Sequence, residues 1–154
     1  MILVLLGTNP YSFERLARAI DELAVGLGGD VFIQTGNTPY HPRHCRWAPF
    51  VPRDAILRMV KDCELLITQG GAGSIHDGLA AGKTVIAVPR RPEFHESTDR
   101  QEELVRALEA EGRILAVHDV AELPSAVARA RDFRPAAAKP NQIPEIIRTF
   151  LSRT

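Results

Sequence analysis

Short apolar runs alternate along the chain with longer segments in which apolar residues recur every three or four positions. A continuous apolar run is typical of a strand buried on both faces of a parallel sheet, and the longer period is typical of an amphipathic helix. The predicted strands cover residues 2–6, 31–35, 65–68, 85–88 and 114–117, and residues 46–50 are compatible with a further short strand. The predicted helices cover residues 12–27, 54–63, 75–81, 99–111, 120–131 and 143–153. This alternation predicts an α/β fold, a doubly wound parallel sheet of the Rossmann-like kind with helices on both faces.

The whole chain, residues 1–154, is expected to form one domain, because its length is sufficient for a single hydrophobic core. Residues 134–144 are rich in proline and alanine and are expected to link this domain to the C-terminal helix 143–153. That helix carries an apolar stripe at helical spacing, which either packs back on the parent domain or docks a partner. The stripe consists of Ile143, Ile146, Ile147, Phe150 and Leu151.

Charge and cysteine content narrow the choice of ligands. The 19 basic and 19 acidic residues cancel, so the chain has no overall field to attract nucleic acid, and an anionic ligand must be held by a local group. Cys45 and Cys63 lack the spacing of a disulfide framework or a metal site, and no metal is predicted. The first apolar run ends at Gly7, too early for a signal peptide or a membrane span, so we expect a cytoplasmic protein.

The strongest chemical feature is the glycine-rich stretch Thr68-Gln69-Gly70-Gly71-Ala72-Gly73-Ser74, between a predicted strand and a helix that we expect to begin near Ser74. Glycines let the backbone approach a ligand closely, and a helix N-terminus offers free N–H groups and a positive dipole end. The stretch therefore suits a phosphate or diphosphate. The alternative is that the glycines only allow tight packing, since a lone glycine-rich loop is a weak signal.

Other polar residues are expected at the same edge of the sheet, where the carboxyl ends of parallel strands meet. Asp77, in the first turn of the predicted helix, could accept hydrogen bonds from a ribose diol or could merely cap the helix with Ser74. Gly7 and Thr8 follow the first strand. The loop after strand 85–88 carries a cation for phosphate and polar groups for sugar hydroxyls, or is a solvated loop with helix capping by Thr98 or Asp99. Its candidate residues are Arg90, Glu96, Asp99 and Gln101.

The order and spacing of these motifs carry a family resemblance. Residues 66–74, Asp77, Gly82-Lys83, Val88-Pro89 and Asp99-x-Gln101 together resemble the donor-binding half of MurG-type glycosyltransferases. More closely, residues 1–112 resemble the small catalytic subunits of two-part UDP-sugar transferases. These include the small subunit of the pair that adds the second GlcNAc to dolichol-linked chitobiose, and the small subunits of the bacterial exopolysaccharide transferase pairs.

The resemblance implies a role for each candidate residue. Asp77 would bind the uridine ribose, at a position where the family usually has Glu. Gln101 and Asp99 would contact the transferred sugar. The loop from Glu96 to Gln101 looks one residue shorter than the common bacterial pattern, and Gln69 stands where relatives often have His. The diphosphate would be held by Gly70, Gly71, Ala72, Gly73 and Ser74, with Gly7 and Thr8 facing it or the partner junction.

The activity that the resemblance implies is an inverting transfer from a UDP-sugar to a lipid-linked sugar acceptor. The acceptor would be held by a membrane-associated partner subunit, which would also supply the general base and would keep this chain at the cytoplasmic membrane surface. No metal or other cofactor is expected, because backbone dipoles and arginines would stabilise the leaving UDP. The alternative is a stand-alone nucleotide-sugar-binding or sensor module without transfer activity.

Overall fold

The computed structural model describes residues 1–137, 147 and 149. Its six strands form one sheet in the order β3-β2-β1-β4-β5-β6, and every neighbouring pair is parallel. The sheet is that of a doubly wound α/β fold, as predicted from the alternation of strands and helices. The strands are β1 (Ile2–Leu5), β2 (Val31–Gln34), β3 (Arg46–Ala48), β4 (Leu65–Gln69), β5 (Val85–Val88) and β6 (Leu115–Ala116).

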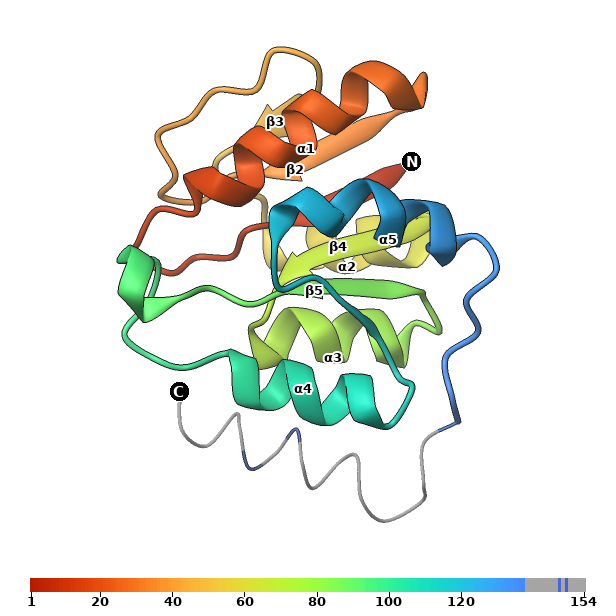
Figure 1. Cartoon of the computed structure of the whole chain (residues 1–154). Coiled ribbons are helices and arrows are strands. Elements are labelled where there is room, and N and C mark those ends of the chain that lie inside the picture. Colours follow the sequence, from red (N-terminus) through yellow and green to blue (C-terminus); the bar gives the residue numbers. More distant parts are fainter. Residues whose placement is uncertain (138–146, 148, 150–154) are drawn as a thin grey trace.

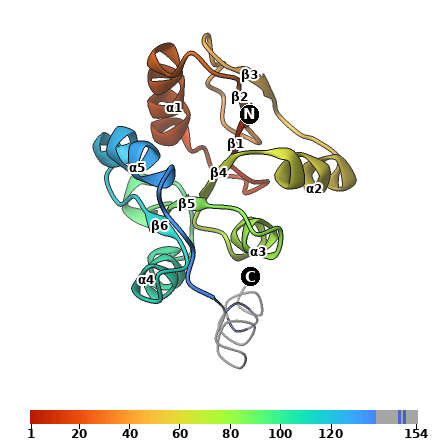
Figure 2. The same cartoon turned by 90° about the vertical axis from the view of Figure 1, so that its right-hand side faces the viewer.

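Helices cover both faces of the sheet, as Figures 1 and 2 show. Helices α1 (Glu14–Leu27) and α5 (Leu123–Ala130) lie on one face. Helices α2 (Arg53–Asp62), α3 (Ala72–Ala80) and α4 (Glu102–Ala110) contribute to the core of the other face. Two short 3₁₀ turns, η1 (Pro92–Phe94) and η2 (Val120–Glu122), precede α4 and α5.

The central strands supply side chains to both cores. Along β1 and just beyond it, Leu3 and Leu5 belong to the core under α2, α3 and α4, whereas Val4 and Leu6 belong to the core under α1 and α5. Fully burying such an aliphatic side chain contributes roughly 1.5–3 kcal/mol. Strand β1 is therefore buried on both faces, which explains its uninterrupted apolar sequence.

Helix α3 packs unusually close to the sheet because of Gly78. A Cβ atom at this position would lie 2.6 Å from both Leu66 Cδ2 and Val85 Cγ2. Ordinary carbon contacts are about 3.5–4.0 Å, so a larger residue would push the helix away. The close packing holds the C-terminal half of α3 against β4 and β5.

Several element boundaries differ from the sequence prediction. Helix α3 begins at Ala72, two residues before the expected start at Ser74, with Gly71 as its extended N-cap. Helix α4 begins at Glu102, with Gln101 as N-cap and no side-chain capping bond, so the proposed capping by Thr98 or Asp99 is wrong. These glycine-rich or polar segments lack an apolar period, and periodicity therefore could not fix where the helices begin.

The C-terminal predictions fall largely outside the described residues. Residue Ile147 is helical and only 4% exposed, so this member of the predicted stripe is buried. The other stripe residues and most of the predicted linker 134–144 are not among the described residues. Among those described, no helix combines the length and the apolar character needed to cross a membrane.

Candidate functional site

A cleft of about 390 Å³ opens at the carboxyl edge of the sheet. It lies beside β1 and β4, whose following segments lead to helices on opposite faces, and ligands of open α/β sheets bind at such a switch point. The lining residues come from the ends of β1, β2 and β4, from the loop after β1 and the segment before α2, and from the first turns of α2 and α3. They are Leu5, Gly7, Thr8, Gln34, Phe50, Val51, Arg53, Ile56, Gln69, Gly71, Gly73 and Ser74.

The three glycines after β4 serve different purposes: Gly70 and Gly71 precede α3, and Gly73 lies in its first turn. None of the three has a positive φ, so a larger residue would be excluded by lack of space and not by the backbone conformation. A Cβ at Gly70 would lie 2.9 Å from Gln101 Cβ and from Val105 Cγ2, which makes this glycine a packing residue. A Cβ at Gly71 would lie 3.0 Å from Gln69 Nε2, whereas one at Gly73 would have nothing within 4 Å.

The N-terminus of α3 faces the cleft through Gly71, Gly73 and Ser74. The N–H group of Ile75 is the first to reach a helical acceptor, Gly71 O at 3.3 Å. The N–H groups of the three residues before it have no intrahelical partner, as in any first turn. The dipole adds roughly half a positive charge at this end. The cleft is therefore suited to an anion.

The opposite wall is the loop after β1, which Gln34 holds in place. Gly7 has φ +83°, a conformation that favours glycine. Its N–H donates to Gln34 Oε1 at 3.0 Å, and Gln34 Nε2 donates to Gly7 O at 3.0 Å and to Pro49 O at 2.9 Å. The fixed loop brings Thr8, which is exposed, to the cleft.

Asp77 is paired with an arginine that the sequence prediction missed. Arg53 donates from Nη1 and Nη2 to the two carboxylate oxygens of Asp77, at 2.5 and 2.9 Å. The carboxylate is 8% exposed and the guanidinium side chain is 67% exposed. The hydrogen bond with Asp77 raises the pKa of Arg53. The pair ties the first turn of α2 to the middle of α3, beside the cleft.

Because α3 begins at Ala72, Asp77 lies beyond the first turn and cannot cap the helix, so the capping alternative is wrong. Its expected contact with a ribose stays a prediction. Arg53 could have been found from its position: it directly follows Pro52 at a helix start, after a strand whose carboxyl end reaches the same edge.

Arg90 lies behind the cleft and not in its wall. Its side chain is 1% exposed and lies over the Phe13 ring, 4.8 Å from the centroid. Its three guanidinium nitrogens all donate to protein acceptors: Nε to Gln69 Oε1 at 2.6 Å, Nη2 to Leu6 O at 2.7 Å, and Nη1 to two carbonyls. Burial lowers the pKa of Arg90 to about 10, an effect that the charge of Glu96 opposes. We expected Arg90 to contact a phosphate, but its guanidinium group instead links the loop after β5 to the segment after β1 and to the end of β4.

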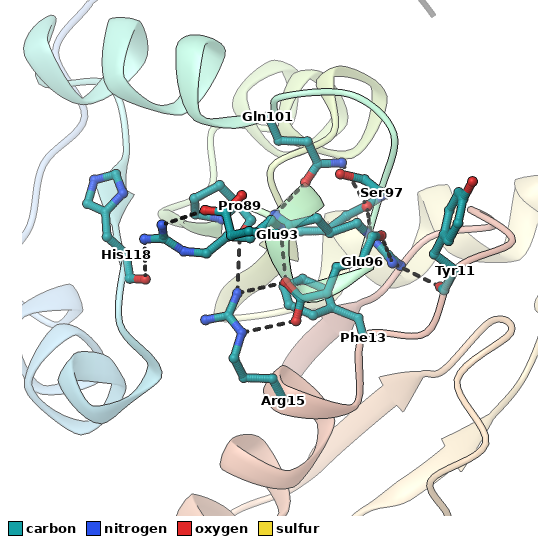
Figure 3. A network of polar contacts seen from close by, with 12 residues as sticks. Tyr11, Phe13, Arg15, Pro89, Glu93, Glu96, Ser97, Gln101 and His118 are labelled. Carbon is teal, nitrogen blue, oxygen red and sulfur yellow. Dashed lines mark hydrogen bonds and ion pairs between the residues drawn. The ribbon is translucent and has the colours of Figure 1, made fainter.

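The rest of the loop after β5 also turns inward (Figure 3). Glu96, 4% exposed, accepts from Arg15 Nε and Nη2, both at 3.0 Å. Gln101 Oε1 accepts from the Arg90 N–H at 2.9 Å, and Gln101 Nε2 donates to Gln69 Oε1 at 3.1 Å. Asp99 is exposed. None of these side chains is among those that line the cleft. The polar groups of Glu96 and Gln101 are used to fold the loop.

The structure therefore brings together some of the predicted site residues and separates others. Gly7, Thr8, Gly71, Gly73 and Ser74 share the cleft. The remaining predicted residues are not among those that line it: Gly70, Ala72, Asp77, Arg90, Glu96, Asp99 and Gln101. The described residues contain no cluster of three or more His, Cys, Asp or Glu side chains placed to hold a metal ion.

Solved structures of glycosyltransferases share this fold. MurG from Acinetobacter baumannii is 16% identical, with a TM-score of 0.61 over 98% of this chain and 49% of that one. The calicheamicin glycosyltransferase CalG4 is 19% identical, with a TM-score of 0.61 over 98% of this chain and 36% of that one. The glycotransferase of kitacinnamycin is 18% identical, with a TM-score of 0.58 over 98% of this chain and 37% of that one. The chain thus spans less than half the length of these proteins.

No curated protein matches the sequence. The family model of the glycosyltransferase family 28 C-terminal domain matches residues 1–149, nearly the whole chain. The fold of the chain, a parallel sheet with helices on both faces, agrees with that of the glycosyltransferase structures. The chain belongs to the glycosyltransferase family 28 C-terminal domain family.

Proposed function

We propose that this domain binds a UDP-sugar and, with a membrane-associated partner subunit, transfers the sugar to a lipid-linked acceptor. The observation that supports the proposal is the open N-terminus of α3 at the sheet edge, with Gly71, Gly73 and Ser74 facing the cleft. A helix terminus with free N–H groups recognises phosphate oxygens without any cationic side chain. The volume of about 390 Å³ is in the range of small-molecule sites.

We assign a place to each part of the UDP. The diphosphate would lie between the N-terminus of α3 and Thr8. The ribose would lie toward Asp77, whose oxygens keep lone pairs beyond those used by Arg53, since a carboxylate accepts about four hydrogen bonds. An apolar wall remains for the uracil ring, and it is formed by Phe50, Val51 and Ile56.

The proposed reaction is a single displacement. The acceptor hydroxyl oxygen forms a bond to the anomeric carbon while the bond from that carbon to the β-phosphate oxygen breaks, and this inverts the configuration. The electron pair leaves with UDP, and the N–H groups at the start of α3 stabilise the growing negative charge without a metal or other cofactor. A base on the partner takes the hydroxyl proton.

The partner enters the proposal because the reaction needs a second binding wall. All the lining residues of the cleft belong to one domain, and the related structures are about two to three times longer than the matched region. We assign the acceptor site to a membrane-associated subunit, which would hold this chain at the cytoplasmic face of the membrane.

One observation favours a second candidate, a nucleotide-binding sensor without transfer activity. The residues expected to contact the transferred sugar, Glu96, Asp99 and Gln101, do not line the cleft. A domain that recognised only the nucleotide would need none of them there.

Two measurements test the proposal. Calorimetric titration of the purified chain with UDP, ADP and uridine should show binding that is selective for UDP. The chain is then added with a labelled UDP-sugar to membranes of its source cells, and transfer into the lipid extract is measured. Selective binding with transfer supports the proposal, and selective binding without transfer supports the sensor. Failure to bind UDP would refute both.

A further inference from the structure

One polar side chain at the cleft, Gln69, has a hydrogen-bond donor that is not used within the described part of the chain. Gln69 is 9% exposed, and its Oε1 accepts two hydrogen bonds, from Arg90 Nε at 2.6 Å and from Gln101 Nε2 at 3.1 Å. Both lone pairs of this oxygen are thus used, which fixes the orientation of the amide. No acceptor within the described part of the chain receives a hydrogen bond from the amide nitrogen, Gln69 Nε2.

The position of this nitrogen follows from the two glycines beside it. A Cβ built on Gly7 would lie 2.1 Å from Gln69 Nε2, and one built on Gly71 would lie 3.0 Å from it. Both glycines line the cleft, and so does Gln69. The amide nitrogen therefore lies between the two walls of the cleft, next to the N-terminus of α3. A side chain on Gly7 would displace it.

Gln69 Nε2 is not one of the fully buried polar atoms that lack a partner in the described chain, so it keeps access to the cleft and is free to donate to a ligand there. Here the donor, the free N–H groups of α3 and the buried charge of Arg90 all favour the same kind of ligand atom, an anionic oxygen. Arg90 does not reach the cleft itself. Its N–H⁺ group polarises the amide from behind, since hydrogen bonds in a chain strengthen one another.

We propose that Gln69 donates from Nε2 to an oxygen of the bound diphosphate, and that Arg90 is the positioning residue that holds the amide in this orientation. This inference rests on the proposed function, because the ligand is taken to be the UDP part of a UDP-sugar. It adds a ligand contact formed by a neutral amide with a buried cation behind it, in place of a cationic side chain exposed in the cleft.

The decisive variant is Gln69→Glu. The new carboxylate still accepts from Arg90 and Gln101, so the fold of the loop is kept, but the donor nitrogen becomes a negatively charged oxygen. A hydrogen bond to a charged group typically contributes a factor of roughly ten to a hundred in affinity. UDP affinity should fall by at least that factor, and uridine affinity should change less than about twofold, because uridine has no phosphate.

Ser125→Asp is the matched control for the added negative charge, because Ser125 is exposed on α5, on the opposite face of the sheet. This variant should bind UDP like the wild-type chain. Equal losses of UDP and uridine affinity in Gln69→Glu would indicate a general structural role and would overturn the inference. So would an unchanged UDP affinity.

A second measurement is made on the wild-type chain and so does not depend on how a variant folds. In amide nitrogen–proton NMR spectra of the wild-type chain, the Gln69 side-chain NH₂ signals should move on addition of UDP and stay in place on addition of uridine. The Gln69→Glu spectrum, or that of Gln69→His, identifies these signals by their absence. Arg90→Lys keeps the positive charge but loses the planar guanidinium group that bonds Gln69 and three backbone carbonyls at once. The amide of Gln69 is then held less firmly, so the variant should have a lower ratio of UDP affinity to uridine affinity.

The outcomes separate this inference from the proposed function. If the wild-type chain binds UDP and the Gln69 signals do not move, the inference fails and the proposed function stands. If the wild-type chain does not bind UDP, both fail.

Discussion

The glycines at the start of α3 allow a test of which one is structural and which one keeps space for a ligand. In Gly70→Ala the new Cβ would lie 2.9 Å from two carbon atoms and 3.1 Å from the backbone Cα of Pro89. Carbon contacts are comfortable at about 3.5 Å, so the neighbours must move by about 0.6 Å. Such overpacking costs about 1–3 kcal/mol, and the lower entropy of the unfolded chain returns about 0.4–1 kcal/mol.

Gly70→Ala should therefore lower the free energy of unfolding by about 1–2 kcal/mol, which is a fall in Tm of about 2–8 °C for a chain of this size. Gly73→Ala meets no atom within 4 Å and lies inside α3, where alanine is favoured over glycine by up to about 1 kcal/mol. It should be as stable as the wild-type chain or more stable, and yet bind UDP more weakly, because its methyl group enters the cleft.

The stability of both variants is measured by urea unfolding with circular dichroism as the signal, and the unfolding midpoints are compared at constant m-value. Calorimetry of the same samples gives their UDP affinities. A Gly70→Ala variant that unfolds at the wild-type midpoint would refute the packing argument. A Gly73→Ala variant with unchanged UDP affinity would show that the ligand does not use this side of the helix.

Three further predictions concern single side chains. Asp77→Ala should weaken UDP binding by roughly 1–3 kcal/mol in calorimetry, and an unchanged affinity would leave Asp77 as a structural partner of Arg53 only. Arg53→Ala should weaken UDP binding less, by about 0.5–1 kcal/mol, and change the stability by at most about 1 kcal/mol, because the guanidinium is exposed; a larger loss of affinity than in Asp77→Ala would contradict this order. Burial alone would raise the pKa of Asp21, but hydrogen bonds from Tyr40 Oη and two backbone N–H groups outweigh it and lower the pKa. The ionised Asp21 carboxylate therefore contributes fully to the free energy of unfolding above pH 3.8, its unfolded-state pKa, and this contribution is lost as the pH falls below that value. Asp21→Asn should lower the free energy of unfolding by about 1–3 kcal/mol at pH 7 and should make that free energy less dependent on pH in the acid range, as measured by urea titrations.

The inward-turned loop after β5 shows where interpretation of the sequence was least reliable. Arg90, Glu96 and Gln101 form a polar segment at the carboxyl end of a strand, a pattern typical of ligand contacts. In the folded chain Arg90 and Glu96 are buried and bonded to groups from β4, α1 and the segment directly after β1. The same residue types serve to bind a ligand or to close a loop, and only their distant partners decide between the two.

The sequence by itself determined the layered α/β architecture and the place of the glycine-rich stretch between a strand and a helix. Both depend on local pattern, since buried strands need continuous apolar residues and helices need a period of 3.6. The tertiary structure decided which polar residues face the cleft. Asp77 meets Arg53, 24 positions away, and Arg90 reaches Leu6 O, 84 positions away. Such pairings depend on the strand order, which brings the end of β1 between those of β2 and β4, and no local pattern encodes that order.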